Sequence, residues 1–317
     1  MNEAIAKLIQ KHRMVREIKW IRTGIHAVDL IIGNGIPQGR ILEIYGSESA
    51  GKSLLAWHIA KAFQKAGGIV ILFDVEATSA KDFASKAGVD INSVIEPSRP
   101  VRTVEQVKDS MLAFCEEIRE ADSSIPILCI WDSIAATSAA GEWQDGDPDT
   151  NKTKANVGQR AKAMSEFFRH WTRWLSDNDI TLVCVNQIRE KIGVMFGKKT
   201  ESPGGKAMKF HASVRIELTR GKRIPRLIDK VESIVGVECH ATIEKNKMAP
   251  PFRKALLRIF WDRGFDEIDG MDELLIDMHR AKPGKGNTIL IKEKHIEISK
   301  LRQAIEADPE LTAPWLN

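Results

Sequence analysis

The sequence is poor in the residue types that build disulfide scaffolds, metal centres and membrane anchors. Its 317 residues include four cysteines and a single tyrosine. None of the cysteines belongs to a Cys-x-x-Cys pair, so a zinc site is not expected. No window approaches the roughly 18 apolar residues of a membrane span, and neither an internal repeat nor a low-complexity tract is present. These absences predict a soluble protein of a reducing, intracellular compartment with no membrane partner.

The numbers of positively and negatively charged residues are nearly equal. The formal net charge is +4, which permits a polyanionic partner without requiring one, because solvated lysine and glutamate faces give the same total. Hydrophobic residues make up 43% of the chain, which is enough at this length for one sizeable core and a small appendage.

Apolar runs alternate with amphipathic segments through the first two thirds of the chain. The runs predicted as strands are 41–46, 69–76, 126–133 and 181–188, and the segments predicted as helices are 53–68, 104–120 and 158–176. The strands are almost continuously apolar, as expected when helices cover both faces of a sheet. The alternation predicts an α/β fold with a central, largely parallel sheet flanked by helices.

The pattern changes after residue 208, where helical periodicity disappears. Three successive strands are predicted at 209–218, 236–245 and 254–261, and they are expected to extend the sheet in an antiparallel manner. The sequence therefore predicts one core that extends to about residue 270, where the pattern weakens.

Two smaller segments flank this core. Residues 1–22 are predicted to be an arm with a helix at 3–18, and the sequence does not decide whether it packs on its own core or docks on a neighbour. Residues 269–317 are predicted to form a small C-terminal unit with one helix near 297–307.

The stretch GSESAGKS, at residues 46–53, follows a predicted strand and opens a predicted helix. It fits the G-x-x-x-x-G-K-S pattern, whose glycines let successive backbone N–H groups point at phosphate oxygens. Lys52 is expected to reach the β- and γ-phosphates, and the Ser53 hydroxyl to ligate Mg²⁺. The phosphate-cradling residues are Gly46, Ser47, Glu48, Ser49, Ala50, Gly51, Lys52 and Ser53.

Two further apolar strands end in acids. Asp132 closes ILCIWD and is expected to hold Mg²⁺ through a water molecule. Glu76 follows VILFDV and is a candidate for activating the attacking water, with Asp74 as a rival that points the same way. Glu76 is favoured because it lies further toward the carboxyl end of its strand, where ligands bind in such sheets.

The predicted helix at 158–176 has two distinct faces. Its large apolar residues recur at helical spacing and predict a core stripe more readily than a base-stacking platform; they are Met164, Phe167, Phe168, Trp171, Trp174 and Leu175. A polar stripe lies opposite, and such stripes are usually solvated. A long polar loop, 141–158, precedes the helix.

The segment 187–210 combines glycines, lysines and a large apolar centre. Apolar wedges among cations suit a single-stranded nucleic acid, whose splayed bases offer apolar faces beside a charged backbone. A loop that contacts a protein partner and a disordered linker are the alternatives.

Six stretches together resemble the RecA-family homologous recombinases of bacterial type. They are spread over about 23–268 in matching order and spacing, and they read LIIGNGIPQGRILEIYGSESAGKS, FDVEATS, IWDSIAA, VNQIREKIGVMFG, GGKAMKFHASVRIEL and EKNKMAPPF. The succession of NQIREKIGVMFG and GGKAMKF is the most specific part, because P-loop ATPases in general lack it.

The resemblance implies roles around the nucleotide. Glu76 stands at the catalytic glutamate, and Gln187 at the residue that senses the γ-phosphate; with Lys52 they are the predicted catalytic residues. Lys245 and Lys247 match the pair that reaches the nucleotide of the adjacent subunit. The aromatic residues that fall where the family flanks adenine are Phe83 and Trp261.

The resemblance also implies DNA contacts. Ile192 falls at the wedge that enters between base triplets. The positions that match contacts to backbone phosphates are Arg189, Lys191, Gly204 and Gly205, and those that match DNA contacts on the helix after the first loop are Lys162, Ser165 and Arg169. The departures are a longer first loop, Val157 in place of the usual methionine, a short arm and no acidic tail.

The resemblance therefore implies a DNA-dependent ATPase that uses ATP and Mg²⁺. It is expected to form helical filaments on single-stranded DNA, to pair with homologous duplex DNA and to exchange strands, in the cytoplasm and at the nucleoid. A regulatory paralogue that binds DNA or a recombinase without strand exchange, and an unrelated P-loop ATPase acting on a protein, are the alternatives.

Overall fold

A computed structural model describes residues 17–77, 81–142, 158–190, 200–201, 206–268, 270–278, 281–284, 286–291 and 294–308. A nine-stranded sheet forms its centre, in the order β13-β12-β11-β10-β3-β7-β6-β4-β5. The strands are β3 (Ile41–Gly46), β4 (Ile69–Asp74), β5 (Val94–Ile95), β6 (Ile127–Asp132), β7 (Ile180–Gln187), β10 (Val214–Ile228), β11 (Val231–Asn246), β12 (Lys254–Phe260) and β13 (Gly264–Phe265). Neighbouring strands from β5 to β10 pair parallel, and β10 to β13 pair antiparallel. The predicted fold class is confirmed.

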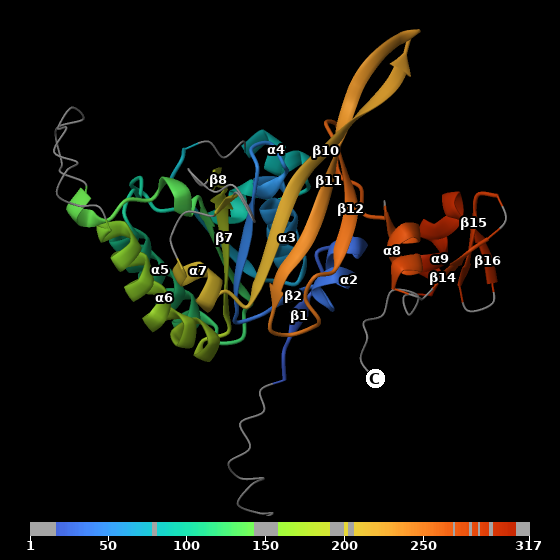
Figure 1. The fold of residues 1–317 in the computed structure, drawn as a ribbon. Helices are drawn as coiled ribbons and strands as arrows, with labels where there is room; N and C mark the ends of the chain where they lie inside the picture. The colour runs from blue at the N-terminus through green and yellow to red at the C-terminus, as the bar shows by residue number, and fades with distance from the viewer. Residues whose placement is uncertain are drawn as a thin grey trace, which may run out of the picture.

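Helices cover both faces of the sheet (Figure 1). One apolar cluster joins the sheet to α2 (His26–Ile32), α3 (Lys52–Lys65) and α4 (Lys81–Lys86). The other joins it to α5 (Val104–Ala121), α6 (Gln159–Asp177) and α7 (Lys206–His211). Successive side chains of a strand point to opposite faces, so in β6 Leu128 belongs to the first cluster and Cys129 to the second. Burial on both faces explains why the strands are continuously apolar.

Local sequence signals set several helix boundaries. The α5 helix starts with a capping box, in which the Thr103 hydroxyl accepts from the Gln106 backbone N–H and the Gln106 side chain accepts from that of Thr103. The α6 helix buries the predicted apolar stripe, because Met164, Phe167 and Phe168 are all buried. The prediction that this stripe belongs to the core is confirmed.

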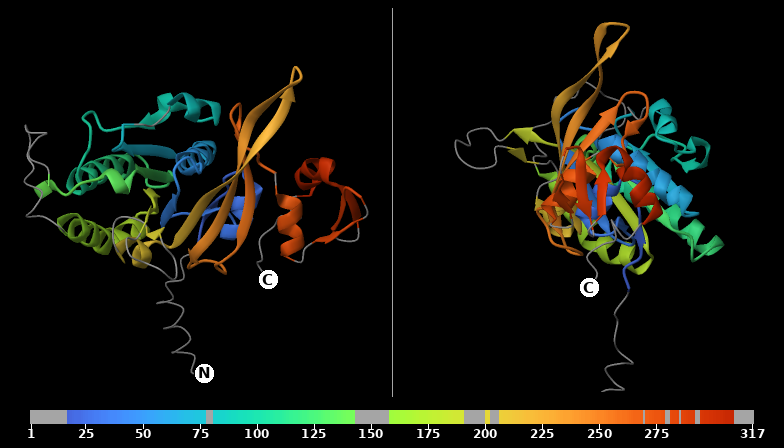
Figure 2. Two further views of the ribbon diagram at one scale, coloured as in Figure 1. Left: turned by 45° about the horizontal axis from the view of Figure 1, so that its top comes forward. Right: turned by 90° about the vertical axis from the view of Figure 1, so that its right-hand side faces the viewer.

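Strands β10 and β11 form a ribbon that continues past the sheet and projects from the body (Figures 1 and 2). The predicted strand at 209–218 is wrong at its start, where residues 209–211 end the helix α7 and β10 begins only at Val214. The predicted antiparallel extension holds for β11 and β12, but β10 itself lies parallel to β3. The sequence does not reveal this break, because Phe210 and Ala212 continue the apolar alternation of the strand that follows.

The C-terminal residues contain more structure than the predicted single helix. The helix α9 (Leu301–Ala307) lies close to its predicted place, but α8 (Met271–Asp277) precedes it, together with a three-stranded sheet. That sheet comprises β14 (Ala281–Pro283), β15 (Thr288–Ile291) and β16 (Lys294–Glu297). The predicted helix at 3–18 lies outside the described residues, apart from 17–18.

Short elements complete the fold. They are β1 (Trp20–Ile21), β2 (Ile36–Pro37), β8 (Arg189–Glu190), β9 (Thr200–Glu201) and the 3₁₀ turns η1 (Ile91–Ser93), η2 (Ile134–Ala136), η3 (Ala140–Glu142) and η4 (Ile298–Lys300). Among the helices of the described ranges, none combines the length and the apolar composition that crossing a bilayer requires.

Candidate functional site: a P-loop at the carboxyl ends of four strands

The loop GSESAGKS joins β3 to α3, as the motif requires. Its first glycine, Gly46, lies against β10 so closely that a Cβ atom there would come within 1.9 Å of the Leu218 carbonyl oxygen. The last, Gly51, precedes α3 in the left-handed conformation with φ 88°, and Ser49 has a positive φ of 55°. The backbone therefore curls as a phosphate cradle must, and glycine is required at both ends for steric reasons.

The two polar residues that open α3 point to different partners. The Lys52 ammonium donates to the Ser47 carbonyl oxygen at 2.7 Å, across the loop that it closes. Burial lowers the pKa of Lys52, against the opposing charges of Asp132 and Glu76. The Ser53 hydroxyl donates to Oδ2 of Asp132 at 2.7 Å. The loop thus holds a desolvated cation on one side and a hydroxyl–carboxylate pair on the other.

Asp132 ends β6 and is half-buried. Burial raises its pKa to about 6; the bond from Ser53 acts in the opposite direction, and the charges of Glu76 and Asp74 add to the rise. Three carboxylates in one place repel one another unless a cation neutralises them. Lys52 offsets part of this repulsion, because its charge lowers the pKa of Asp132, and a bound cation would offset more of it.

Glu76 and Gln187 meet beside this pair. The Gln187 amide donates from Nε2 to Oε1 of Glu76 at 3.1 Å, and the Ser133 hydroxyl donates to the same carboxylate oxygen. Asp74 lies at the end of β4 directly opposite Asp132 in the sheet. The structure thus brings Glu76 to the predicted sensor residue and places its rival Asp74 next to the predicted magnesium ligand.

Strand order explains this convergence. Strands β3, β7, β6 and β4 are consecutive neighbours and run parallel, so their carboxyl ends share one edge of the sheet. Gly46 pairs with Gln187 across β3 and β7. Ligands of open α/β sheets bind at this edge.

The residues at this edge fit Mg²⁺ with a nucleoside triphosphate. They supply a lysine for phosphate charge, a hydroxyl and a carboxylate, which is the donor set that magnesium uses beside phosphates and water. Among the described residues no group of three His, Cys, Asp or Glu side chains is arranged to hold a metal.

Lys245 and Lys247 lie level with the amino-terminal end of β3, whereas the P-loop follows the carboxyl end of that strand. Lys245 lies at the end of β11 and Lys247 directly follows that strand. There Asn246 pairs with Val214, and Val214 pairs with Leu42, near the start of β3. Four residues of strand separate Leu42 from Gly46, or about 13 Å. The lysines therefore lie well away from the P-loop of their own copy.

Lys245 is held by the end of α7. Its ammonium donates to the carbonyl oxygens of Lys209 and Phe210 at 2.6 and 2.9 Å. Burial, followed by the charges of Lys247 and Arg215, lowers the pKa of Lys245 to about 8. An anionic group beside Lys245 would therefore be stabilised by these positive charges.

The two predicted adenine-flanking aromatics lie in separate places. Phe83 of α4 packs against the apolar cluster beside α3. Trp261 follows β12, and its indole N–H donates to the Ile234 carbonyl oxygen at the base of the ribbon. Among the described residues their rings do not form an aromatic pair within one copy.

The predicted DNA contacts are described only in part. Lys162, Ser165 and Arg169 are exposed on one face of α6, although the Ser165 hydroxyl donates back to the Ala161 carbonyl oxygen. Arg189 begins β8. The predicted contacts that lie outside the described residues are Lys191, Ile192, Gly204 and Gly205, together with Val157.

A buried ionic cluster behind the P-loop was not predicted. Glu43 of β3 is fully buried; it accepts from Arg215 of β10 at 2.5 Å and from Asn186 of β7 at 2.9 Å. Arg215 also lies over the Tyr45 ring, 4.6 Å from its centre. An acid inside the apolar strand ILEIYG requires a buried partner, and this signal could have indicated the cluster.

The site and the fold together define a class of protein. A largely parallel sheet whose strand β3 passes through GSESAGKS into a helix is that of a P-loop nucleotide-binding protein. The chain belongs to the RecA family, because the family model described as RecA N-terminal domain matches residues 1–266.

Curated relatives agree with this family. Protein RecA of Ruminococcus albus is 38% identical over 282 residues, which cover 89% of the chain and 66% of that protein. Protein RecA of Pseudarthrobacter chlorophenolicus is 38% identical over 82% of the chain and 69% of its own length. For Protein RecA of Bacteroides thetaiotaomicron the identity is 39%, over 79% and 71%. The chain thus spans 66–71% of these relatives.

Proposed function

We propose that this protein is an ATP-dependent recombinase, which assembles into helical filaments on single-stranded DNA and exchanges strands with homologous duplex DNA. Family membership supports the class. The observation that carries the proposal is the meeting of Lys52, Ser53, Asp132, Glu76 and Gln187 at one sheet edge. Magnesium bound there would neutralise phosphate charge, with Ser53 and Asp132 as its protein-side partners.

The separation of the lysines from the P-loop supports a composite site. Lys245 and Lys247 lie about 13 Å along the sheet from the P-loop of their own copy, which favours a contact with the nucleotide of a second copy. In the proposed filament the lysines of one subunit face the phosphates held by the next. We also propose that residues 1–22 dock on a neighbour, that 23–268 act as the ATPase and DNA-binding core with 269–317 as a C-terminal unit, and that the protein works in the cytoplasm, at the nucleoid.

Strand exchange is the direct test of this function. The full chain should form joint molecules between a labelled oligonucleotide and a homologous supercoiled duplex with ATP, and not with ADP. The Lys52→Ala variant should be inactive, because it removes the cation that offsets phosphate charge. A chain that hydrolyses ATP on DNA but forms no joint molecules under any of these conditions would instead be the regulatory paralogue.

Complementation tests the composite site. The Lys247→Ala variant lacks one half of the proposed site and Lys52→Ala lacks the other. Each variant alone should therefore turn over ATP on DNA at least about tenfold more slowly than the parent. In an equal mixture about a quarter of head-to-tail contacts join two intact halves. The mixture should therefore regain measurable steady-state hydrolysis.

The control for this mixture is the double variant Lys52→Ala/Lys247→Ala added to either single variant. The double variant adds the same mass of protein, but it lacks both Lys52 and Lys247 and so cannot supply the lysine that the single variant is missing. Co-assembly is checked by light scattering. A mixture of the single variants that co-assembles on DNA and is no more active than this control would contradict a site shared between subunits.

The segment 187–210 allows two kinds of DNA contact to be separated. Lys191→Ala should weaken oligo-dT binding and reduce the salt slope by about one, because a phosphate contact releases counterions. Ile192→Ala should leave binding within about threefold and slow strand exchange more strongly, because an apolar wedge acts on base stacking. Fluorescence anisotropy at several salt concentrations and a strand-exchange assay measure the two. Equal effects of both variants on binding and exchange would contradict the division of roles.

A further inference from the structure

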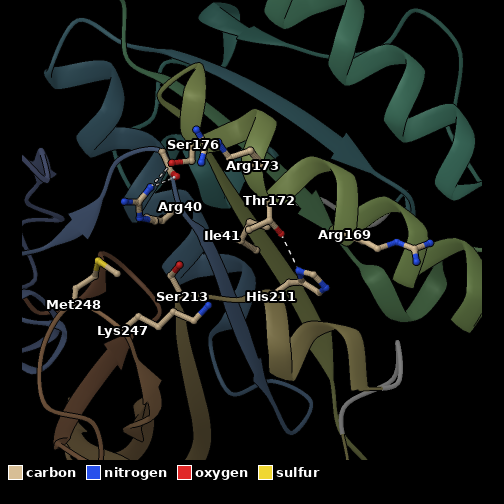
Figure 3. Close-up of a pocket in the computed structure, with 11 residues that line it drawn as sticks. Arg40, Ile41, Arg169, Thr172, Arg173, Ser176, His211, Ser213, Lys247 and Met248 are labelled. Carbon is tan, nitrogen blue, oxygen red and sulfur yellow. Dashed lines mark hydrogen bonds between the residues drawn. The ribbon is translucent and has the colours of Figure 1, made fainter. Parts of the chain in front are cut away.

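A cavity of about 450 Å³ lies at the end of the sheet opposite the P-loop (Figure 3). Its wall is built from the start of β3, the C-terminal half of α6, the end of α7, the start of β10 and the segment after β11. Its volume lies within the range of small-molecule sites. Neither the P-loop nor the catalytic cluster contributes to it.

The cavity is strongly cationic. Its lining includes Arg40, Arg169, Arg173 and Lys247, and among the described residues that line it none is acidic. These cations come from the residue before β3, from α6 and from the segment after β11, so the fold gathers them from distant parts of the sequence. Arg173 is already paired with Asp177 of the same helix, at 2.7 Å. The charges of Arg40, Arg169 and Lys247 around the same space repel one another, and an anion would relieve that repulsion.

Burial and the same positive charges lower the pKa of a neighbouring histidine, His211. Burial lowers the pKa of His211, and the charges of Lys247, Lys245 and Arg169 lower it further. The His211 ring bonds through Nδ1 to the Thr172 hydroxyl at 3.0 Å, with the ring at the cavity wall (Figure 3).

Hydroxyl groups accompany the cations and orient one of them. Nη1 of Arg40 donates to the Ser176 hydroxyl at 2.6 Å and to the Gly39 carbonyl oxygen at 3.0 Å. The bonds recorded for Arg40 within the described residues use Nη1 alone, and a guanidinium has five N–H donors. Ser213 and Thr172 add further hydroxyls to the wall. A guanidinium group fixed beside hydroxyls, as Arg40 is here, supplies donors that phosphate oxygens prefer.

We propose that this cavity is a second anion site, which binds a small polyphosphate, either inorganic or the phosphate tail of a nucleotide. Arg40 and Arg173 are its distinguishing residues, because neither belongs to the predicted nucleotide or DNA contacts. Lys247 stands at the edge of the cavity and links it to the face that meets a neighbouring copy. The proposal goes beyond the proposed function and requires neither a filament nor DNA.

Binding of sodium tripolyphosphate to the full chain tests the site. All variants carry Lys52→Ala, which weakens phosphate binding at the P-loop, and the titration is followed by calorimetry without DNA. Adding Arg173→Gln or Arg40→Gln should each weaken tripolyphosphate binding at least about tenfold, since each removes a charge-assisted contact. Affinity should also fall as NaCl is raised.

The matched control is Lys108→Gln, which removes one positive charge from α5 at a side chain 44% exposed and outside the cavity. It should leave the affinity within about twofold, as expected of a screened surface charge. Because Arg40 is partly buried, Arg173, whose side chain is 75% exposed, keeps the test valid if Arg40→Gln fails to fold.

Two further arms distinguish the ligand's source. Titration with an ATP analogue in the same Lys52→Ala background shows whether the phosphate tail of a nucleotide is accepted as well as the inorganic anion. Titration with oligo-dT tests the competing occupant, DNA. If Arg40→Gln and Arg173→Gln weaken oligo-dT binding but leave tripolyphosphate binding unchanged, or if tripolyphosphate does not bind, the proposal is overturned.

Discussion

Replacing Glu76 by glutamine should slow DNA-stimulated ATP hydrolysis by a factor of at least about 100 and leave nucleotide binding close to the parental value. Glutamine preserves the size of the side chain and an oxygen that can accept from Gln187, which bonds Glu76 at 3.1 Å. It removes the negative charge and the basic oxygen that a water molecule needs. Steady-state phosphate release on oligo-dT, with nucleotide affinity from a fluorescent analogue, separates the two effects.

Asp74→Asn is the matched control, because it makes the same chemical change two residues earlier. Asp74 lies across from Asp132 and contributes to the raised pKa of that carboxyl group. Its replacement should change hydrolysis by less than about tenfold, as expected of an electrostatic neighbour. Parental hydrolysis by Glu76→Gln together with an inactive Asp74→Asn would assign the base to Asp74.

Replacing Arg215 by methionine should lower the free energy of unfolding by about 3–5 kcal/mol, because it leaves a buried carboxylate without its cation. The Glu43 side chain is 0% exposed and that of Arg215 is 10% exposed, at 2.5 Å from each other. Methionine keeps much of the length of arginine, so the change removes charge more than volume. Urea unfolding of the full chain without nucleotide measures the difference.

Two comparisons make this prediction specific. Adding Glu43→Gln to Arg215→Met should restore a large part of the lost stability, because the uncompensated charge is gone. Arg258→Met on β12 is the surface control, since its ion pair with Glu238 is 4.0 Å long and 36% exposed on the arginine side. That change should cost at most about 1 kcal/mol. An Arg215→Met variant as stable as the Arg258→Met variant would contradict the account.

The central strands and the P-loop were predictable because local patterns determine them. Buried parallel strands must be apolar on both faces, and GSESAGKS needs its glycines wherever a helix follows. Asp132 and Glu76 were also predictable as candidates, because parallel strands bring their carboxyl ends together. Their roles in catalysis remain predictions for the experiments above.

The ionic cluster and the cationic cavity depend on register and on strand order. Glu43 and Arg215 are 172 positions apart, and only the pairing of β3 with β10 makes them neighbours. Arg40 and Lys247 share a wall because β10 returns beside β3 and β11 returns beside β10. The end of α7 at 209–211 was missed because Phe210 and Ala212 continue the alternation of apolar residues that marks the strand from Val214 onward.

The lysines lie level with the start of β3 and the P-loop follows its end, so a head-to-tail assembly of copies would have two unlike ends. Under the proposed function, n stacked copies contain n−1 complete nucleotide sites, because a head-to-tail contact does not close on itself. The terminal copy on one side displays a P-loop without lysines, and the copy on the other side displays lysines without a phosphate to meet. ATP turnover per copy should therefore rise with the length of the assembly, and addition and loss of copies should proceed at different rates at its two ends.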